Sequence, residues 1–406
     1  GHMAKLQADA PALSGMADNW SKIENASITD LNTSANSLKL SNGKEWTYKS
    51  LVLAPGFDQG THHIKGLEEM ASEANNVFVH IIDTTQRMVE NYYHGWQHQS
   101  GDMICYSPAS PYKGEGCDFY APYYEHFNRQ DKLFGLCSEN ARIQYWTPNK
   151  YIYAFPYANE VALDECAKRN IDVMFGWEMI EVKFDESQQK IAVFRNVDSG
   201  EVIEKDFNSA VINPPSKAHD FLQKADGVLD AKGGVDVNHY TLQHKKHENI
   251  FAFGDCIGGN TTRTQIGAHG QEPIVKNNML QFMHGRDCNA IWDGYTWMPF
   301  YLGHSYATSF SHNHYFEPAS RNHMVPHYGV FSRFYFGRQM KGSAGAAKKY
   351  SKMSKDHGPP HFHYPASYDE LEHSELLQER GVLPEAVRHP NAQARIDAAA
   401  KEVTTA

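Results

Sequence analysis

The side chains of this chain that could do redox chemistry are its cysteines. There are six, with no C-x-x-C pair among them: Cys105, Cys117, Cys137, Cys166, Cys256 and Cys288. A cysteine thiolate can attack sulfur or carbon electrophiles, whereas scattered single cysteines are typical of a chain kept in a reducing compartment. The segment "DGYTWMPF" (293–300) has Met298 between aromatic residues and a proline. A thioether cannot ionise, so Met298 is expected to pack and not to react.

Two apolar strands end in turns suited to a nucleotide. The segment "NIFAFGDCIGG" ends its strand at Gly254-Asp255, and a helix is expected to follow from about Thr264. This order places a carboxylate at the carboxyl edge of a sheet, where ribose or ribityl hydroxyls bind; the alternative is that Asp255 caps the next helix. The strand in "YKSLVLAPG" ends at Gly56, which allows a close backbone approach.

Histidines are numerous, and some could ligate a metal. The chain has 23, including His357, His361 and His363 in "HGPPHFH". Zinc sites hold four ligands on rigid elements, and this proline- and glycine-rich stretch offers no partner cysteine or carboxylate pattern. These three histidines are therefore weak metal candidates, and interfacial histidines are the alternative. The chain contains no Walker loop, H-E-x-x-H motif or Ser-His-Asp arrangement.

The elements that must position these residues alternate between strands and helices. Asn42-Gly43 predicts a hairpin, "GDMICYSPAS" and "SAVINPP" predict buried strands, and "ESQQ" predicts a turn between two more strands. Helices are expected at 118–142, 157–169 and 263–284. This order predicts an α/β protein: Rossmann-like dinucleotide-binding domains with a central, mainly parallel sheet, a β-meander and an irregular aromatic- and histidine-rich C-terminal extension.

Composition excludes some classes of partner. The 406 residues carry 38 Lys and Arg against 48 Asp and Glu, a net charge of -10, so nucleic acid is not expected as a partner. No apolar run approaches the roughly 18 residues that span a bilayer. Residues 1–3 have the appearance of an expression tag.

The chain resembles the sulfide:quinone oxidoreductases, most closely the mitochondrial type of these flavoproteins with two dinucleotide-binding domains. The matching segments run in family order from about residue 40 to about residue 303: "LSNGKEWTYKSLVLAPGFDQGTHHIKGLEE", "SAVINPP", "GGVDVNHYTLQHKKHENIFAFGDC" and "WDGYTWMP". The resemblance implies FAD as cofactor. By resemblance, Gly254-Asp255 contacts the ribityl chain, Gly56 lies near the flavin, and the helix at Thr264 points its amino end toward the ring system.

The chain departs from the family pattern where the chemistry is done. The G-x-G-x-x-G turn that holds the FAD pyrophosphate is expected before residue 20 and is not found. Family enzymes use two cysteines beside the flavin; one position falls on or near Gly114, with Cys117 three residues late, and the other holds Met298. Cys117 and Cys256 are weak candidates for a substitute pair, and the alternative is that each is an inert, buried small hydrophobe. The bulky Arg263, among others, follows "GDC" where the family has small residues, so the flavin is expected to be lost or incompletely held.

The chain is expected to divide into segments with different roles. After the tag, they are a remnant of the FAD-binding domain (4–70), a second dinucleotide-binding-like domain (71–205), a return to the first (206–287), a membrane- or partner-facing region (288–366) and a helical tail (367–406). Residues 331–355 carry seven basic and no acidic side chains. They predict peripheral contact with anionic lipid or an acidic protein, or a solvated helix face.

Two main functions remain open from the sequence, besides a metal-binding module that would use His361 and His363. One is a scaffold subunit of a mitochondrial inner-membrane assembly, bound to other protein subunits and inactive toward sulfide. The other is an FAD-dependent, quinone-reducing oxidoreductase whose amino-terminal FAD-binding half is missing from this chain.

Overall fold

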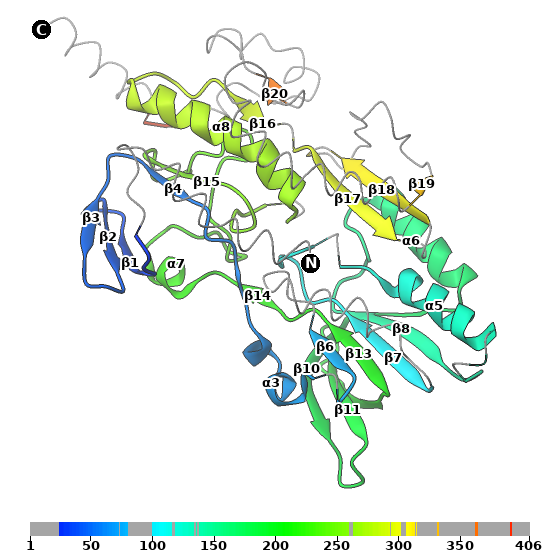
Figure 1. Cartoon of the computed structure of the whole chain (residues 1–406). Coiled ribbons are helices and arrows are strands. Elements are labelled where there is room, and N and C mark those ends of the chain that lie inside the picture. The colour runs from blue at the N-terminus through cyan, green and yellow to red at the C-terminus, as the bar shows by residue number, and fades with distance from the viewer. Residues whose placement is uncertain are drawn as a thin grey trace, which may run out of the picture.

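The computed structural model describes about two thirds of the chain. The described residues are 24–72, 74–79, 100–115, 118–133, 135, 138–259, 263–292, 294–301, 306–312, 314, 331–332, 362–363 and 390–391. Figure 1 shows them as two halves joined by extended segments.

The first half is a small sheet system covered by a long helix. An antiparallel meander, β1-β2-β3, precedes β4, and β4 pairs in parallel with β15, more than 190 positions later in the sequence. Helix α8 lies over this pair, and an apolar core that includes Phe251, Ile274 and Trp292 joins them. The elements are β1 (Ile28–Asn32), β2 (Ser37–Leu40), β3 (Glu45–Thr47), β4 (Leu51–Leu53), α7 (Asp220–Lys224), β15 (Ile250–Ala252) and α8 (Gln265–Met283).

The second half is built on a five-stranded parallel sheet in the order β6-β13-β7-β8-β9. Helices α5 and α6 lie against it, and an antiparallel sheet of β10, β11 and β12 extends from it. The elements are α3 (Leu67–Met70), β6 (Val77–Val79), β7 (Asp102–Tyr106), α5 (Ala121–Leu133), β8 (Arg142–Thr147), α6 (Pro156–Lys168), β9 (Asp172–Phe175), β10 (Trp177–Phe184), β11 (Lys190–Asn196), β12 (Val202–Asp206) and β13 (Ser209–Ile212).

Strand β7 explains why this sheet is buried on both faces. Side chains alternate along a strand, and Met103 and Cys105 enter one apolar core while Ile104 and Tyr106 enter the other. The first core packs against α5 and α6, and the second against the β10-β11-β12 sheet. All five residues of β7 are buried, as is usual for a central parallel strand.

Two extended crossings connect the halves. Strand β5 (Asp58–Gln59) leaves the first half, β14 (Ser216–Lys217) returns to it, and the two pair antiparallel. A one-turn 3-10 helix, η1 (Thr61–His63), follows β5. The polypeptide therefore passes between the halves twice at one place.

The C-terminal region returns to the second half. Strand β17 pairs with β18, and its Met298 and Phe300, with Phe310 of β18, are fully buried in the core beside α6. The elements are β16 (Ile291–Trp292), β17 (Thr296–Tyr301), β18 (Tyr306–His312), β19 (Phe331–Ser332) and β20 (Phe362–His363).

The structure confirms the predicted α/β class with a mainly parallel sheet and a β-meander. The hairpin at Asn42-Gly43 joins β2 to β3, and the predicted helices appear as α5, α6 and α8. Helix α5 is shorter than expected because it ends at Leu133, and Gly135 follows with a φ of 70° that a continuing helix does not adopt. The segment boundaries remain a prediction, and the helical tail lies almost wholly outside the described residues.

Helices that could cross a membrane are absent from the described part of the chain, because none is both long and apolar enough.

Met298→Ala is expected to lower the free energy of unfolding by about 2–5 kcal/mol, because the side chain is fully buried and its removal leaves a cavity. Urea unfolding followed by circular dichroism measures this. Met283→Ala is the matched control, since Met283 is 56% exposed and its loss should change stability by less than about 0.5 kcal/mol. Equal effects of the two substitutions would contradict the packing role.

Candidate functional site

The candidate site is the edge where the parallel strands β4 and β15 end together. Leu53 lies opposite Ala252 in the ladder, so both strands deliver the chain to the same edge. Gly56 follows β4 with a φ of 70°, and Gly254 follows β15 with a φ of 81°. Both turns need glycine, and the carboxyl edge of a parallel sheet is where open α/β folds bind ligands. We call this edge the sheet mouth.

The predicted cofactor residues lie at or beside the sheet mouth. Asp255 is partly buried directly after Gly254, whose amide donates to Gln271 Oε1 of α8 at 2.7 Å. Thr264 is the N-cap of α8, and its Oγ1 accepts from the Gly267 amide at 3.1 Å. The capping alternative for Asp255 is therefore not realised at α8.

Arg263 lies inside the sheet mouth. Its side chain is 2% exposed, and its Nη2 donates to the Ile257 carbonyl at 3.2 Å. The guanidinium carbon is 5.6 Å from the centroid of the Phe57 ring, within the range of a cation–π contact. The guanidinium thus contacts both Phe57, which follows Gly56, and Ile257, which follows Asp255 by two residues.

Arg263 also binds the second half of the molecule. Its Nη1 lies 3.0 Å from Glu115 Oε2, and the Glu115 side chain is only 15% exposed. Burial raises the pKa of Glu115, while the charge of Arg263 acts to lower it. Breaking a buried ion pair leaves one charge without compensation, which is strongly destabilising. The pair therefore holds the loop 107–118 against the sheet mouth.

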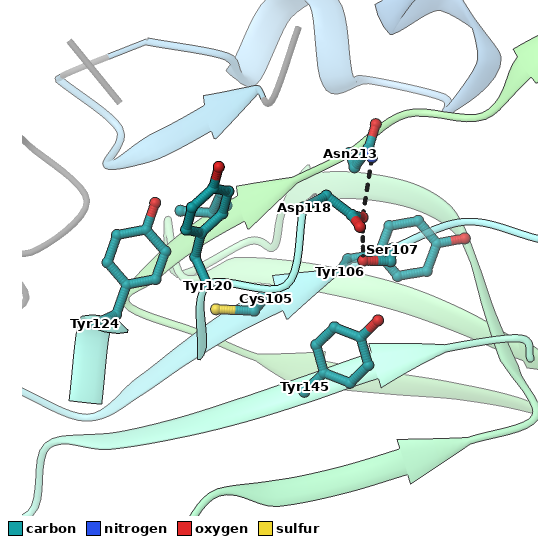
Figure 2. A pocket seen from close by; sticks show the side chains of 9 residues that line it. Cys105, Tyr106, Ser107, Asp118, Tyr120, Tyr124, Tyr145 and Asn213 are labelled. Atoms are coloured by element: carbon teal, nitrogen blue, oxygen red, sulfur yellow. Dashed lines mark hydrogen bonds between the residues drawn. The ribbon is translucent and has the colours of Figure 1, made fainter. Parts of the chain in front are cut away.

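The same loop is fixed to the five-stranded sheet by Asp118. Figure 2 shows its carboxylate receiving hydrogen bonds from Ser107 Oγ at 2.5 Å and from Asn213 Nδ2 at 3.0 Å. Tyr112 donates to the other oxygen at 3.1 Å. Burial raises the pKa of Asp118 and of Tyr112. A raised carboxyl pKa in a cavity is a property of acid–base sites as well as of structural networks.

The size of the cavity beside Asp118 distinguishes an acid–base site from a structural network. It measures about 10 Å³ and is lined by Cys105, Tyr120 and Tyr145, among others. That volume holds about one water molecule, and ligand pockets are far larger. Asn213 also accepts from Gln59 of β5 at 2.6 Å, so the network continues into the crossing between the halves. The arrangement serves to fix the loop.

The two positions where the family cysteines are expected from the sequence carry no thiol, and the structure describes both residues. Gly114 is buried with a φ of 78°, and Met298 is fully buried in the core of the second half. Burial raises the pKa of Cys256 to about 12, so it is a neutral thiol near pH 7. Cys256 belongs to the core of the first half and Met298 to that of the second, while Cys117 lies outside the described residues.

The predicted histidine cluster falls mostly outside the described residues. His363 is described in β20, opposite Ile291, and His357 and His361 are not. The structure instead brings together a set that sequence reasoning missed, Asp58, His62 and His63. Its signal was the spacing D-x-x-x-H-H in "DQGTHH", which a search for clustered histidines alone overlooks.

Comparisons with known proteins agree with the family resemblance. No family model matches the chain. Among curated proteins, the mitochondrial sulfide:quinone oxidoreductase of Schizosaccharomyces pombe is 28% identical over 282 residues, covering 68% of this chain and 59% of that protein. The mitochondrial sulfide:quinone oxidoreductase of Mus musculus is 27% identical, covering 68% of this chain and 60% of that protein. The chain thus spans about three fifths of the length of these relatives.

Two solved structures share the fold. A chain in the cryo-EM structure of the Tetrahymena thermophila mitochondrial ATP synthase is 26% identical and superposes with a TM-score of 0.73, covering 84% of this chain and 82% of that one. The sulfide:quinone oxidoreductase of Aquifex aeolicus is 16% identical with a TM-score of 0.57, covering 88% of each chain.

Arg263→Met is expected to lower the free energy of unfolding by about 3–5 kcal/mol at neutral pH, because Glu115 is left buried without its partner. Arg263→Met combined with Glu115→Gln should recover much of that loss. Urea unfolding of both variants gives the comparison. Equal losses in the single and double variants would show that the charge of Glu115 is not what Arg263 compensates.

The pH dependence of Arg263→Met follows from the same pair. Without the guanidinium the folded-state pKa of Glu115 rises further above its unfolded value of about 4.3, so the folded chain binds the proton more tightly. The free energy of unfolding should then fall as pH rises from the unfolded pKa toward the folded pKa. The variant should lose stability over this window relative to the natural chain, and the double variant should not. A variant whose pH profile parallels that of the natural chain would contradict this.

Proposed function

We propose that this chain, a divergent sulfide:quinone oxidoreductase-like protein, is a structural subunit of a mitochondrial inner-membrane assembly of the ATP synthase kind and does not oxidise sulfide. The observation that carries the proposal is the superposition on a chain of the Tetrahymena mitochondrial ATP synthase, with a TM-score of 0.73 over 84% of this chain. The structure of the Aquifex aeolicus sulfide:quinone oxidoreductase shares the fold, with a TM-score of 0.57.

The chemistry of the family positions supports the absence of sulfide oxidation. Sulfide oxidation through a thiolate adduct needs a cysteine that can ionise beside an electron acceptor. Gly114 and Met298 offer none, and the raised pKa of Cys256 keeps that thiol protonated. A buried methionine contributes packing where the enzyme needs a nucleophile.

The sheet mouth as described does not fit a flavin. A planar ring system between Phe57 and Ile257 would have to displace the Arg263 guanidinium and break its ion pair with Glu115. We therefore infer that these side chains took over the space and the cohesive role that a bound cofactor has in a flavoprotein.

The proposed location rests on the relatives, and the proposed membrane contact rests on residues 331–355. The curated relatives carry the mitochondrial designation, and this chain is mitochondrial and peripheral in the proposal. Residues 331–355, with seven basic and no acidic side chains, would approach anionic lipid or an acidic subunit. Other protein subunits are the expected partners, and no nucleic acid is involved.

The rival function is that of an FAD-dependent oxidoreductase reducing a quinone. The turns at Gly56 and Gly254 and the carboxylate of Asp255 favour it, since they preserve one edge of a dinucleotide site. It requires Arg263 to move out of the sheet mouth.

Purified natively from its own mitochondria and then denatured, the protein should release no stoichiometric flavin by absorbance and fluorescence. Sulfide-dependent reduction of a short-chain quinone should also be absent. A mitochondrial sulfide:quinone oxidoreductase handled in parallel is the positive control. One flavin per chain would support the rival function, and quinone reduction by sulfide would refute the proposal.

Membership of an assembly is tested on the protein in the mitochondrial membrane. After mild-detergent extraction and native electrophoresis, a tagged chain should comigrate with the band that hydrolyses ATP and remain there through a second dimension. Migration as a free chain, with the ATP-hydrolysing band unlabelled, would reject the subunit role.

A further inference from the structure

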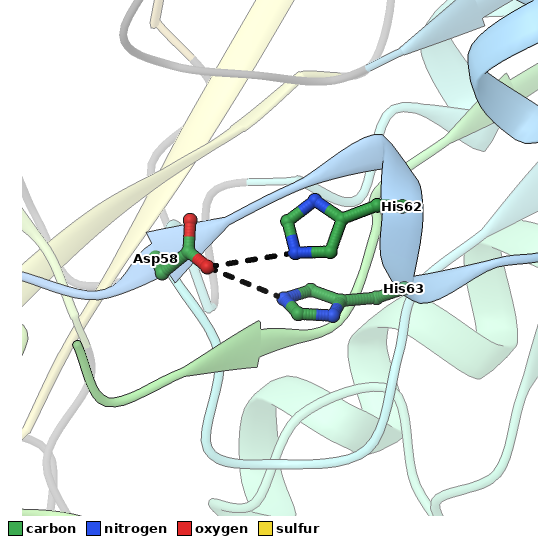
Figure 3. Close-up of side chains that lie close together, drawn as sticks. All are labelled: Asp58, His62 and His63. Carbon is green, nitrogen blue, oxygen red and sulfur yellow. Dashed lines mark ion pairs between the residues drawn. The ribbon is translucent and has the colours of Figure 1, made fainter. Parts of the chain in front are cut away.

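The crossing between the two halves carries a cluster of metal-ligating side chains. Asp58 lies in β5, and His62 and His63 lie in the following 3-10 helix. Figure 3 shows both imidazole rings directed toward the Asp58 carboxylate. Nε2 of His62 and Nε2 of His63 are each 3.7 Å from the same oxygen, Oδ2. Among the described residues, three ligand atoms converge on one small space.

The two nitrogen–oxygen distances fit ligands of one metal ion better than hydrogen-bonded partners. At 3.7 Å a nitrogen and an oxygen are too far apart to be hydrogen-bonded. Two ligands of one tetrahedral zinc ion, each about 2.0–2.1 Å from it, lie roughly 3.4 Å apart. Each nitrogen–oxygen separation is thus a few tenths of an ångström from that spacing, and all three ligand atoms lie within 4.8 Å of one another.

The Nε2 atom of His63 supplies a second, independent sign. It is buried and makes no hydrogen bond to any described residue. Buried polar atoms almost always have a partner, and an exception calls for an ion or an ordered water at that place. The Asp58 carboxylate, also on this side of the ring, makes a positive ion the fitting partner.

Gly60 gives the cluster its shape. A Cβ at this position would collide with the His62 ring, so only glycine leaves the ring in its described place between the backbone and Asp58. Lys217 lies opposite Asp58 in the β5–β14 pair, where its positive charge would oppose a cation. The site is therefore expected to take an ion that binds imidazole strongly.

We propose that Asp58, His62 and His63 bind one divalent transition-metal ion of the zinc class, with the remaining coordination position open. Two imidazoles and a carboxylate are one ligand set of three-ligand zinc sites and also bind Fe²⁺, whereas softer ions prefer thiolates and harder ions prefer oxygen ligands. Because β5 is one of the two strands that cross between the halves, the bound ion would fasten the start of the second half to the crossing.

The full chain, freed of metal by a chelator and dialysed, is titrated with Zn²⁺ in a calorimeter and against a chromophoric chelator. The natural chain should bind one equivalent more than His62→Ala, and Asp58→Asn and Gly60→Ala should lose the same equivalent. His62 is 58% and Asp58 46% exposed at the side chain, so these two substitutions leave the core intact. Co²⁺ in place of Zn²⁺ should give the strong visible bands of four-coordinate cobalt, and His62→Ala should lose them.

A triple variant, His357→Ala with His361→Ala and His363→Ala, is the matched control for the histidine-rich stretch. This triple variant should still bind the equivalent of Zn²⁺ that His62→Ala fails to bind. Saturating Zn²⁺ should also raise the melting temperature of the natural chain and of this control, and leave that of His62→Ala unchanged. The proposal is overturned if the natural chain binds no Zn²⁺ in the titration, if His62→Ala binds as many equivalents as the natural chain, or if only the triple variant loses one.

Discussion

The buried ion pair between Arg263 and Glu115 is the interaction on which the arrangement of the two halves depends. It starts at the sheet mouth, where the chain turns after β4 and β15, and ends on the loop 107–118 of the second half. The loop is in turn fixed to the five-stranded sheet through Asp118. In a water-excluded place, removing one partner of such a pair costs far more than breaking a surface ion pair, because each charge is tolerated only when the other is present.

Contacts next to Arg263 also join the two halves. The Thr264 hydroxyl, beside Arg263, lies 3.0 Å from that of Thr296 on β17, and two residues further Met298 enters the core of the second half. Arg263 and Thr264, at the start of α8, thus contact the sheet mouth, the loop 107–118 and the hairpin of β17 and β18. A fold that holds a dinucleotide must leave room at this edge, whereas here the described side chains bind one another. In the proposed function, these contacts give the scaffold cohesion at the edge where a dinucleotide would bind.

The sequence predicted the elements better than their contacts. The Asn42-Gly43 turn, the buried run of β7 and the GDC strand follow from local periodicity and turn chemistry, and all three were found. Arg263 was noted only as bulk, because its partner Glu115 lies 148 positions away and no local pattern links them. The Asp58, His62 and His63 cluster was missed although it is local, because it forms only when the 3-10 helix after the extended Gly60 turns both rings toward the carboxylate. Long-range pairing is fixed by the packed fold, and one sequence alone does not encode it visibly.

An experimental density map of the chain in its native assembly, at a resolution that shows side chains, tests the central claim most directly. The measured quantity is the separation of the Arg263 guanidinium from the Glu115 carboxylate at the sheet mouth. The account predicts hydrogen-bonding distance, with the guanidinium over Phe57 and no planar tricyclic density beside it. A flavin ring in that space, with Arg263 turned away from Glu115, would contradict the account.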